Sequence, residues 1–458
     1  MPFLPLKIRE IMTKVITYGT YDLFHYGHQR LLERAKALGD YLIVGVTADD
    51  FDKARGKINV EQSLMERIEA VKRTGLADEV IVEEYEGQKI DDIQRYDVDV
   101  FAIGSDWVGK FDYLKEYCEV VYLDRTQGVS STELRAERKL LRLGLVGRIG
   151  GVCKYAAEAS YVNGLEVVGV MVNDKEQFAN RFPNVPLLAD DYDELLSQVD
   201  AVYLVSHPSL HYQQIRTALL KGKHVLCESP IALSVDQYNE LIELAKKQGV
   251  ILMDAIKTAY SMAYNRLVLL LKGGKIGRIV SVDAICTSLK DLQDSDFKNL
   301  ESKWNTICAW GPTALLPVFQ LLGPNYKCKT ITSSFIDKDL HFDIFTKIAF
   351  VYDHAVASIK VGKGVKSEGE LIISGTQGYV YVPSPWWKTD FFEIRYEDSE
   401  RNKRYFYQLD GEGIRYELVQ FVKAIESGRP SFYIQPNTSR AIVNAIEDFY
   451  HGIDVIGI

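Results

Sequence analysis

Two histidines stand close together near the N-terminus, directly after the first buried apolar run at residues 15–18. They belong to the stretch Gly19-Thr20-Tyr21-Asp22-Leu23-Phe24-His25-Tyr26-Gly27-His28. Because His25 and His28 are three residues apart, both imidazoles can point to one side of a turn. Their N–H groups could then contact phosphate oxygens as charge builds in a transition state. Gly27 permits a tight entry into a helix, whose N-terminus attracts phosphate. The stretch therefore predicts chemistry on a phosphoryl group.

Further polar clusters follow the next apolar runs of the chain. They are Gly56-Lys57, Glu66-Arg67, the run 104–112 that includes Asp106, and the run 125–132. Several of these residues also have a purely structural interpretation. An H-x-G-H string can arise by chance, Trp107 and Phe111 could be core residues, and Ser130 with Glu133 could form a capping box. The order of the clusters along the chain favours a common site over these alternatives.

The elements that would position these clusters alternate between strand and helix. Apolar runs at 15–18, 41–46, 79–82, 98–103 and 119–123 predict buried parallel strands. Helical patterns at 29–38 and 64–74 lie between them, and a polar helix is expected at 131–140. This alternation is typical of a doubly wound α/β sheet, in which ligands bind at the carboxyl ends of the strands. The clusters would then meet at one edge.

With these motifs in order, residues 14–137 resemble the HxGH nucleotidyltransferases, most closely the glycerol-3-phosphate cytidylyltransferases. The resemblance implies that a phosphate oxygen of a polyol phosphate attacks the α-phosphorus of CTP and pyrophosphate leaves. Because the nucleophile is already ionised, catalysis comes from positioning and charge neutralisation. Mg²⁺ would accompany the triphosphate. The site would thus hold CTP and a small polyol phosphate.

The resemblance also implies roles for single residues. His25, His28, Lys57 and Arg125 would be catalytic, with the histidines at the pentavalent centre and the two cations on phosphate groups. CTP and the polyol phosphate would be bound by Gly19, Thr20, Tyr21, Asp22, Gly27, Arg55, Arg67, Asp106, Thr126, Ser130, Ser131 and Thr132. Arg55 departs from the family, which carries a lysine there, so charge is kept while the geometry of the contact changes.

A second alternation of strands begins at residue 142. Strands are expected at 142–146, 166–172, 201–205, 224–227 and 250–253. After about residue 275 the segments 279–286, 345–351, 355–361 and 378–382 tend toward period two, which predicts a mostly antiparallel sheet. Helices at 414–427 and 438–451 close the chain. The fold class predicted is α/β, with a doubly wound domain, a Rossmann-like domain and an α+β domain containing a large sheet.

From about residue 141 onward the chain resembles the Gfo/Idh/MocA oxidoreductases. The residues that carry this resemblance are 200–205, 209–212, 273–277 and the run Gly222-Lys223-His224-Val225-Leu226-Cys227-Glu228-Ser229-Pro230. The resemblance implies a Rossmann domain that binds NAD(P), followed by a domain with an open sheet. We divide the chain into an extension at 1–13, a cytidylyltransferase domain at 14–138, a Rossmann-like domain at 139–260 and a C-terminal domain at 261–458.

Four departures argue against the family's usual chemistry. The dinucleotide loop is two residues short, reading Gly147-Arg148-Ile149-Gly150 without the preceding Gly-x. Val172 stands where an acidic residue is expected, with Asp174 two places on. The Glu-Lys-Pro motif has become Glu228-Ser229-Pro230. The D-x-G-x-H helix reads Ala309-Trp310-Gly311-Pro312-Thr313.

A hydride transfer would still need a proton donor. Lys257 and His211 are the candidates for a relocated acid, and Gly147, Gly150 and Glu228 complete the candidate second site. The alternative is that Lys257 is a solvated loop residue and His211 merely begins a helix. The same chain therefore allows a degenerate oxidoreductase domain or a working one.

Composition limits the classes of function. A net charge of −9 argues against a general nucleic-acid binder. The six cysteines form no CxxC pair, which favours a reducing cytoplasm over disulfides or a zinc site, and the protein is expected to supply no metal ligands of its own. No apolar run is long enough to insert into a membrane. We expect a cytoplasmic homo-oligomer.

Three whole-chain hypotheses remain. The leading one is a cytidylyltransferase that makes a CDP-polyol, with a degenerate oxidoreductase-like region used for dimerisation, regulation or docking. The second is a bifunctional enzyme whose second half reduces a ketose phosphate with NAD(P) to the polyol phosphate that the first half activates. The third is a non-catalytic nucleotide-binding scaffold, against which His25, His28 and Arg125 argue. By resemblance, the product would supply teichoic acid or capsule synthesis in a bacterial envelope.

Overall fold

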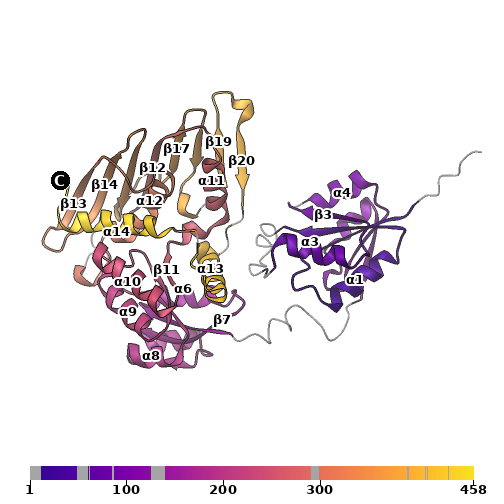
Figure 1. The fold of residues 1–458 in the computed structure, drawn as a ribbon, viewed down its shortest axis with the longest axis horizontal. Helices are drawn as coiled ribbons and strands as arrows, with labels where there is room; N and C mark the ends of the chain where they lie inside the picture. Colours follow the sequence, from indigo (N-terminus) through magenta and orange to yellow (C-terminus); the bar gives the residue numbers. More distant parts are fainter. Residues whose placement is uncertain are drawn as a thin grey trace, which may run out of the picture. The chain divides into compact units, whose positions relative to one another are not determined.

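Ten stretches of the chain carry the described structure in the computed structural model. They are residues 12–48, 60, 62–84, 87–124, 140–289, 299–388, 391–407, 409, 411–431 and 433–458. These residues belong to two compact units, unit 1 at 1–139 and unit 2 at 140–458 (Figure 1). The predicted helix at 131–140 lies almost wholly outside the described residues. The predicted division near residue 260 falls inside unit 2 and stays a prediction.

Unit 1 is a five-stranded parallel sheet in the order β3-β2-β1-β4-β5. One face carries α1 and α3, whose Leu32, Ala35, Ile68 and Val71 pack on strand residues, while Ile93 of α4 packs on the other face. Burial on both faces explains the apolar runs. Because all five strands are parallel, their carboxyl ends share one edge. The elements are β1 Lys14–Gly19, α1 Tyr26–Lys36, β2 Tyr41–Thr47, α3 Leu64–Arg73, β3 Glu79–Glu83, α4 Gln88–Tyr96, β4 Val100–Gly104, η1 Ser105–Trp107, η2 Asp112–Glu116 and β5 Glu119–Leu123.

Unit 2 begins with a six-stranded parallel sheet in the order β11-β10-β9-β6-β7-β8. The strand order reverses between β6 and β9, so the switch point where ligands bind lies at their carboxyl ends. The elements are β6 Leu141–Gly147, α6 Ile149–Ala159, β7 Leu165–Val172, α7 Lys175–Arg181, β8 Leu187–Leu188, α8 Tyr192–Gln198, β9 Ala201–Val205, α9 Pro208–Leu220, β10 His224–Glu228, α10 Val235–Gln248, β11 Leu252–Ala255, η3 Lys257–Tyr260 and α11 Met262–Lys272.

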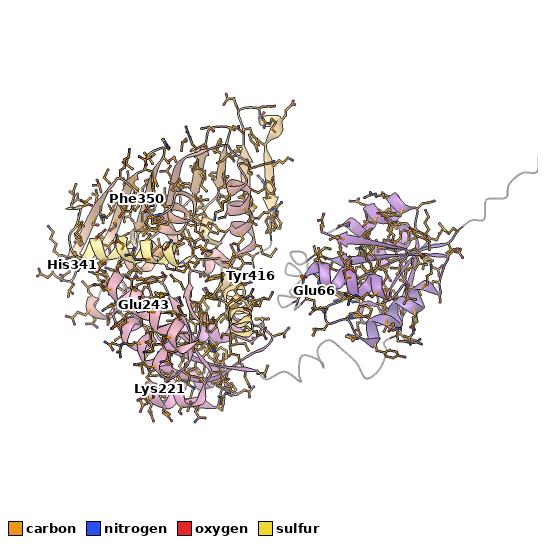
Figure 2. All side chains as sticks on the ribbon, in the orientation of Figure 1. Glu66, Lys221, Glu243, His341, Phe350 and Tyr416 are labelled. Atoms are coloured by element: carbon orange, nitrogen blue, oxygen red, sulfur yellow. The ribbon has the colours of Figure 1, made fainter. Side chains whose placement is uncertain are left out.

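A large sheet completes unit 2, with α12 packed on β12, β14 and β15 (Figure 1). Phe350 of β14 meets Phe319 of α12, with ring centroids 5.6 Å apart (Figure 2). The prediction of a mostly antiparallel sheet is confirmed, with β12–β15 and β13–β21 as parallel pairs. The elements are β12 Ile279–Leu289, η5 Leu300–Ser302, α12 Thr306–Leu322, β13 Cys328–Asp337, β14 Phe342–Val351, β15 Val356–Gly362, β16 Gly364–Val365, β17 Leu371–Gly375, β18 Tyr379–Val382, η6 Trp386–Lys388, β19 Phe391–Arg395, η7 Ser399–Arg401, β20 Lys403–Phe406, η8 Gly411–Gly413, α13 Ile414–Ser427, α14 Pro436–Tyr450 and β21 Val455–Gly457.

Two strands start two residues later than their apolar runs predict, for the same reason. Asp97 ends α4 and Gly249 ends α10, each with a left-handed backbone. The next residue closes the helix end, because Val98 N donates to Ile93 O and Val250 N donates to Ala245 O. An apolar residue is common at this position of a helix C-cap. Val98 and Val250 therefore belong to helix ends, and β4 and β11 begin at Val100 and Leu252.

All six cysteines are free thiols. Among the described residues, no helix has the length and apolar content that crossing a membrane requires.

Candidate functional site

The loop after β1 is shaped by the contact between Gly19 and Tyr21. The Tyr21 ring lies so close that a Cβ on Gly19 would stand 2.9 Å from its Cζ atom. Tyr21 is buried, and both Tyr21 and Leu23 have positive φ angles, of 54° and 47°. Left-handed backbone at two non-glycine residues is strained and persists only where the surroundings enforce it. The loop is thus held in one shape before α1 begins.

The two predicted histidines are brought together at the start of α1. Their rings stack with centroids 3.9 Å apart and planes 19° apart. His25 is the N-cap residue, and its Nδ1 accepts a hydrogen bond from Gly27 N at 3.0 Å. That bond places the ring proton of a neutral His25 on Nε2, where it can be donated to a phosphate oxygen. The His28 ring also lies against the rings of Tyr21 and Phe24, and in each pair the ring centroids are 5.5 Å apart.

Arg67 is enclosed by backbone segments around the site, and its contact with substrate stays a prediction. Its side chain is fully buried, and Nη1 donates to Thr20 O at 2.7 Å and Thr47 O at 2.8 Å. Nε donates to Gln62 O at 3.1 Å. The guanidinium joins the loop after β1, the end of β2 and the approach to α3. Arg67 is a positioning residue, since it acts through the segments that it holds.

The remaining predicted residues of this site include Asp22 and Asp106, which the structure describes, and seven residues that lie outside the described part of the chain. Asp22 is buried and its Oδ1 accepts from Gln62 N at 3.0 Å, so it too fixes the loop. Asp106 is exposed in η1 and follows β4, the strand beside β1, so it lies at the same sheet edge as the histidines. The predicted residues outside the described part of the chain are Arg55, Lys57, Arg125, Thr126, Ser130, Ser131 and Thr132.

A buried polar network beneath this edge was not predicted. Lys89 and Glu83 form an ion pair with side chains only 8% and 1% exposed. Thr47 Oγ1 donates to Glu83 at 2.9 Å, and Tyr18 Oη donates to Asp92 at 2.8 Å. Tyr18, Thr47 and Glu83 all lie at or near the carboxyl ends of their strands, behind the site. The available signal in the sequence was Glu83, a charged residue directly after the apolar run at 79–82.

Unit 2 has a cavity of about 500 Å³ at the carboxyl ends of β6, β7 and β9. We call it the edge cavity. Its lining is Val146, Gly147, Arg148, Met171, Val172, Asn173, Ser206, His207, Ser209, Leu210, Gln214, Glu301 and Ser302. Of the five predicted second-site residues, only Gly147 lines it. This is the place where a doubly wound sheet binds a nucleotide.

The residues at this edge do not fit a dinucleotide. Only Arg148 separates the end of β6 from the start of α6, so there is no glycine loop to wrap a pyrophosphate. Asn173 Oδ1 accepts from Ile149 N at 3.0 Å and so occupies the first amide of the helix. Asp174 caps α7 through Gln177 N at 2.9 Å, so its carboxylate is already engaged.

His211, one of the two predicted candidates for a relocated acid, is enclosed in the interior of unit 2. It is fully buried, its Nδ1 lies 2.8 Å from Pro230 O, and its Nε2 lies 3.0 Å from Ser206 O. Burial lowers the pKa of His211 to about 4. With both ring nitrogens facing backbone carbonyls in the interior, it has no nitrogen for a substrate. Burial and the two backbone carbonyls make His211 part of the framework of unit 2.

Lys257 and Glu228 belong to a second polar network, most of whose members no sequence motif indicates. Lys257 Nζ lies 3.3 Å from Glu412 Oε2, and burial lowers its pKa. Glu228 accepts from Tyr155 Oη, and burial raises the pKa of its carboxyl. The network also contains a fully enclosed glutamate on α13. Tyr203 Oη donates to Glu417 at 2.5 Å, and burial raises the pKa of Glu417 to about 8.

Comparison with known proteins divides the chain at the same place. Residues 16–137 match the family described as cytidylyltransferase-like, and residues 141–255 match the oxidoreductase family with an NAD-binding Rossmann fold. Over 126 residues the chain is 56% identical to the glycerol-3-phosphate cytidylyltransferase of Bacillus spizizenii, covering 28% of this chain and 97% of that protein. The enzyme of the same name from Staphylococcus aureus is 50% identical over 129 residues, covering 28% of this chain and 95% of that protein.

Unit 2 also resembles solved structures. A 3-ketoreductase from Actinomadura kijaniata, solved with NADP and TDP-benzene, superposes with a TM-score of 0.61 at 18% identity. The match covers 70% of this chain and all of that one. At this identity the likeness concerns the fold. Both predicted family resemblances and the predicted fold class are confirmed.

Proposed function

Because this chain belongs to the glycerol-3-phosphate cytidylyltransferase family through residues 16–137, we propose that it joins CTP to a polyol phosphate, glycerol phosphate first of all. The family matches support a nucleotidyltransferase domain that is fused to a Gfo/Idh/MocA oxidoreductase fold. The CDP-polyol product suits the synthesis of a bacterial envelope polymer such as teichoic acid, and the setting that we propose is the cytoplasm.

In the reaction a phosphate oxygen of the polyol phosphate attacks the α-phosphorus of CTP. The bond from that phosphorus to the bridging oxygen of the β-phosphate breaks, and pyrophosphate leaves with the electron pair. No base is needed, because the attacking oxygen is already ionised. His25, through Nε2–H, and His28 stabilise the charge on the pentavalent phosphorus. Lys57 and Arg125 are the cations proposed for the phosphates, and Mg²⁺ arrives with the triphosphate.

The stacked pair His25–His28 at the N-terminus of α1 is the observation that carries this proposal. It places two imidazoles where the helix dipole already favours phosphate. Pyrophosphate release from CTP plus glycerol-3-phosphate tests the proposal. His28→Ala should lower kcat by about a hundredfold or more, the scale of losing one oxyanion donor. Turnover equal to the wild type would sink the mechanism.

The identity of the polyol is tested by a substrate panel. Glycerol-3-phosphate, glycerol-2-phosphate and longer alditol phosphates are each supplied with CTP, and pyrophosphate is measured. We expect the highest kcat/KM with glycerol-3-phosphate, the substrate named for the relatives in Bacillus spizizenii and Staphylococcus aureus. A preference for a longer alditol phosphate would replace glycerol in the proposal while leaving cytidylyl transfer intact.

For unit 2 we propose a role without hydride transfer. The short turn at Arg148 and the enclosed His211 support this proposal over a ketose phosphate reductase. Mixing the protein with NADPH and a ketose phosphate should give no loss of absorbance from the reduced nicotinamide. Steady oxidation of NADPH that needs the ketose phosphate would restore the bifunctional hypothesis.

A further inference from the structure

The edge cavity of unit 2 has no part in the proposed function. Its volume of about 500 Å³ lies within the range of small-molecule sites. Val146, Met171, Val172 and Leu210 give it apolar walls, and the rest of its lining is mostly polar or charged. An apolar wall with a few polar groups is the usual make-up of a site that binds an organic ligand.

The cavity lies where one of the two nucleotide halves of a dinucleotide binds in this type of fold. A dinucleotide in a doubly wound sheet extends over the strand ends on both sides of the switch point, which here lies between β6 and β9. The cavity lies over β6 and β7 and reaches the residues that follow β9. The nicotinamide half of a dinucleotide would lie over the carboxyl ends of β9 and β10.

Residues 301–304 lie between the edge cavity and the place where the nicotinamide half would bind. Arg148, which follows β6, donates to Ser302 O. His207, which follows β9, has Nε2 3.0 Å from Lys303 O. The ring centroids of Trp304 and His211 are 5.8 Å apart. His211 Nδ1 in turn contacts the backbone oxygen of Pro230, which follows β10. The segment 301–304 therefore contacts residues that follow β6 and β9, and it reaches the residues after β10 only through His211.

The edge cavity has groups that suit a nucleoside phosphate. Arg148 supplies an exposed positive charge at the N-terminus of α6, where the helix dipole also favours an anion. A Cβ at Gly150 would meet no atom within 4 Å, so a phosphate can approach the backbone there. Glu301 lines the other side of the cavity with a carboxylate, the group that nucleotide sites of this fold use for ribose hydroxyls.

We propose that the edge cavity binds a single nucleoside phosphate and excludes a dinucleotide. The phosphates lie at Arg148 and the open backbone of Gly150, past the Ile149 amide that Asn173 occupies. The base lies against Met171, Val172 and Leu210, and residues 301–304 border the strand ends where the second half of a dinucleotide would lie. This makes unit 2 a nucleotide-binding unit without a redox cofactor. The proposal does not depend on the polyol that unit 1 uses.

Isothermal titration of the full-length chain tests this proposal with three probes: ADP, CDP and NADPH. CDP can also bind unit 1, so the criterion is the response to Arg148→Ala, which removes the cation from the cavity. We expect ADP or CDP to bind with an affinity that falls at least about tenfold in this variant, the loss of roughly one charge-assisted contact. NADPH should bind no more than about threefold tighter than ADP, because its second half finds no site.

Arg181→Ala is the matched control, since Arg181 is exposed in the last turn of α7 and does not line the cavity. Its affinities should equal those of the wild type. Leu210→Trp provides an independent block, because Leu210 is 50% exposed and a larger ring there fills the cavity without entering the core. Nucleotide binding that neither Arg148→Ala nor Leu210→Trp weakens would overturn the proposal. So would NADPH binding tenfold or more tighter than ADP, which would mark a dinucleotide site.

Discussion

His25 combines a structural and a chemical task in one imidazole. Its Nδ1 caps α1 through Gly27 N, and its ring lies stacked on His28. The cap places the ring proton of a neutral His25 on Nε2, so the same bond that ends the loop also sets the tautomer. The two tasks can be separated, because only the second needs an imidazole.

Two substitutions at His25 separate those tasks. His25→Asn keeps an oxygen that can accept from Gly27 N, whereas His25→Ala removes the cap. We expect both variants to lower kcat by about a hundredfold or more, through loss of the donor to phosphate. Only His25→Ala should also lower the free energy of unfolding, by about 1 kcal/mol. Pyrophosphate release and thermal unfolding are the two measurements. Wild-type turnover in His25→Asn would show that capping is the whole role of His25.

Among the elements of unit 1, the ends of β2 and β3 are joined to α4 by buried charge. Lys89 of α4 pairs with Glu83 of β3, and Thr47 of β2 donates to the same carboxylate. Removing one partner of a buried pair leaves a charge without compensation, which costs far more than losing an exposed pair. The network therefore keeps the carboxyl ends of β2 and β3 at a fixed spacing.

Lys89→Met should destabilise unit 1 by about 3 kcal/mol or more, because Glu83 then stays buried without a cation. Adding Glu83→Gln removes the second charge and should recover most of that loss. Lys72→Met is the control, since Lys72 and Glu69 form a pair that is 55% and 51% exposed. It should change stability by less than about 1 kcal/mol. Hydrogen exchange of the β1–β3 peptides reports on this unit. Equal protection in Lys89→Met and Lys72→Met would contradict the argument.

In unit 2, α13 carries an enclosed carboxyl that makes stability depend on pH. Burial raises the pKa of Glu417 from 4.5 to about 8, so the folded state favours the protonated form. Figure 2 marks the neighbouring Tyr416 on the same helix. The contribution of this group to stability is complete below the unfolded pKa and is lost as pH rises through the folded pKa.

The melting temperature of unit 2 should therefore fall as the pH rises from near 4.5 to beyond 8. Glu417→Gln keeps an acceptor for Tyr203 and should flatten this dependence. Glu426→Gln, at an exposed position of the same helix, should leave it unchanged. Tryptophan fluorescence follows unit 2, because four of the five tryptophans lie in it. A profile of Glu417→Gln identical to the wild type would assign the pH dependence to other groups, of which Glu228 and Lys257 are nearest.

At the scale of the whole molecule, the division into two units has a direct consequence. Unit 1 has its own sheet and both of its core clusters. The relative from Bacillus spizizenii consists almost entirely of the matched 126 residues. We expect a chain ending at Lys139 to keep kcat/KM for CTP within about threefold of the full protein, since no residue proposed for cytidylyl transfer lies in unit 2. Pyrophosphate release measures this, and loss of activity in a folded fragment would show that unit 2 completes the site.

The sequence alone determined the properties that depend on neighbours along the chain. The spacing of His25 and His28, the apolar runs of β1 to β5 and the short turn at Arg148 are local, because helix and strand periods fix which side chains share a face. The motifs could therefore predict the doubly wound fold and the phosphate chemistry. They could not locate Val98 and Val250 correctly, because an apolar residue after a helix cap looks like the start of a strand.

Only the tertiary structure decided which polar side chains remain available to a ligand. Arg67 and His211 have the residue types of a site, yet burial and backbone carbonyls make both of them part of the framework. Lys89 and Glu417 looked unremarkable in sequence and became enclosed charges. The closure at Arg148 and Ser302 joins residues 154 positions apart. Desolvation and partner geometry depend on atoms that are distant in sequence, and no local pattern records them.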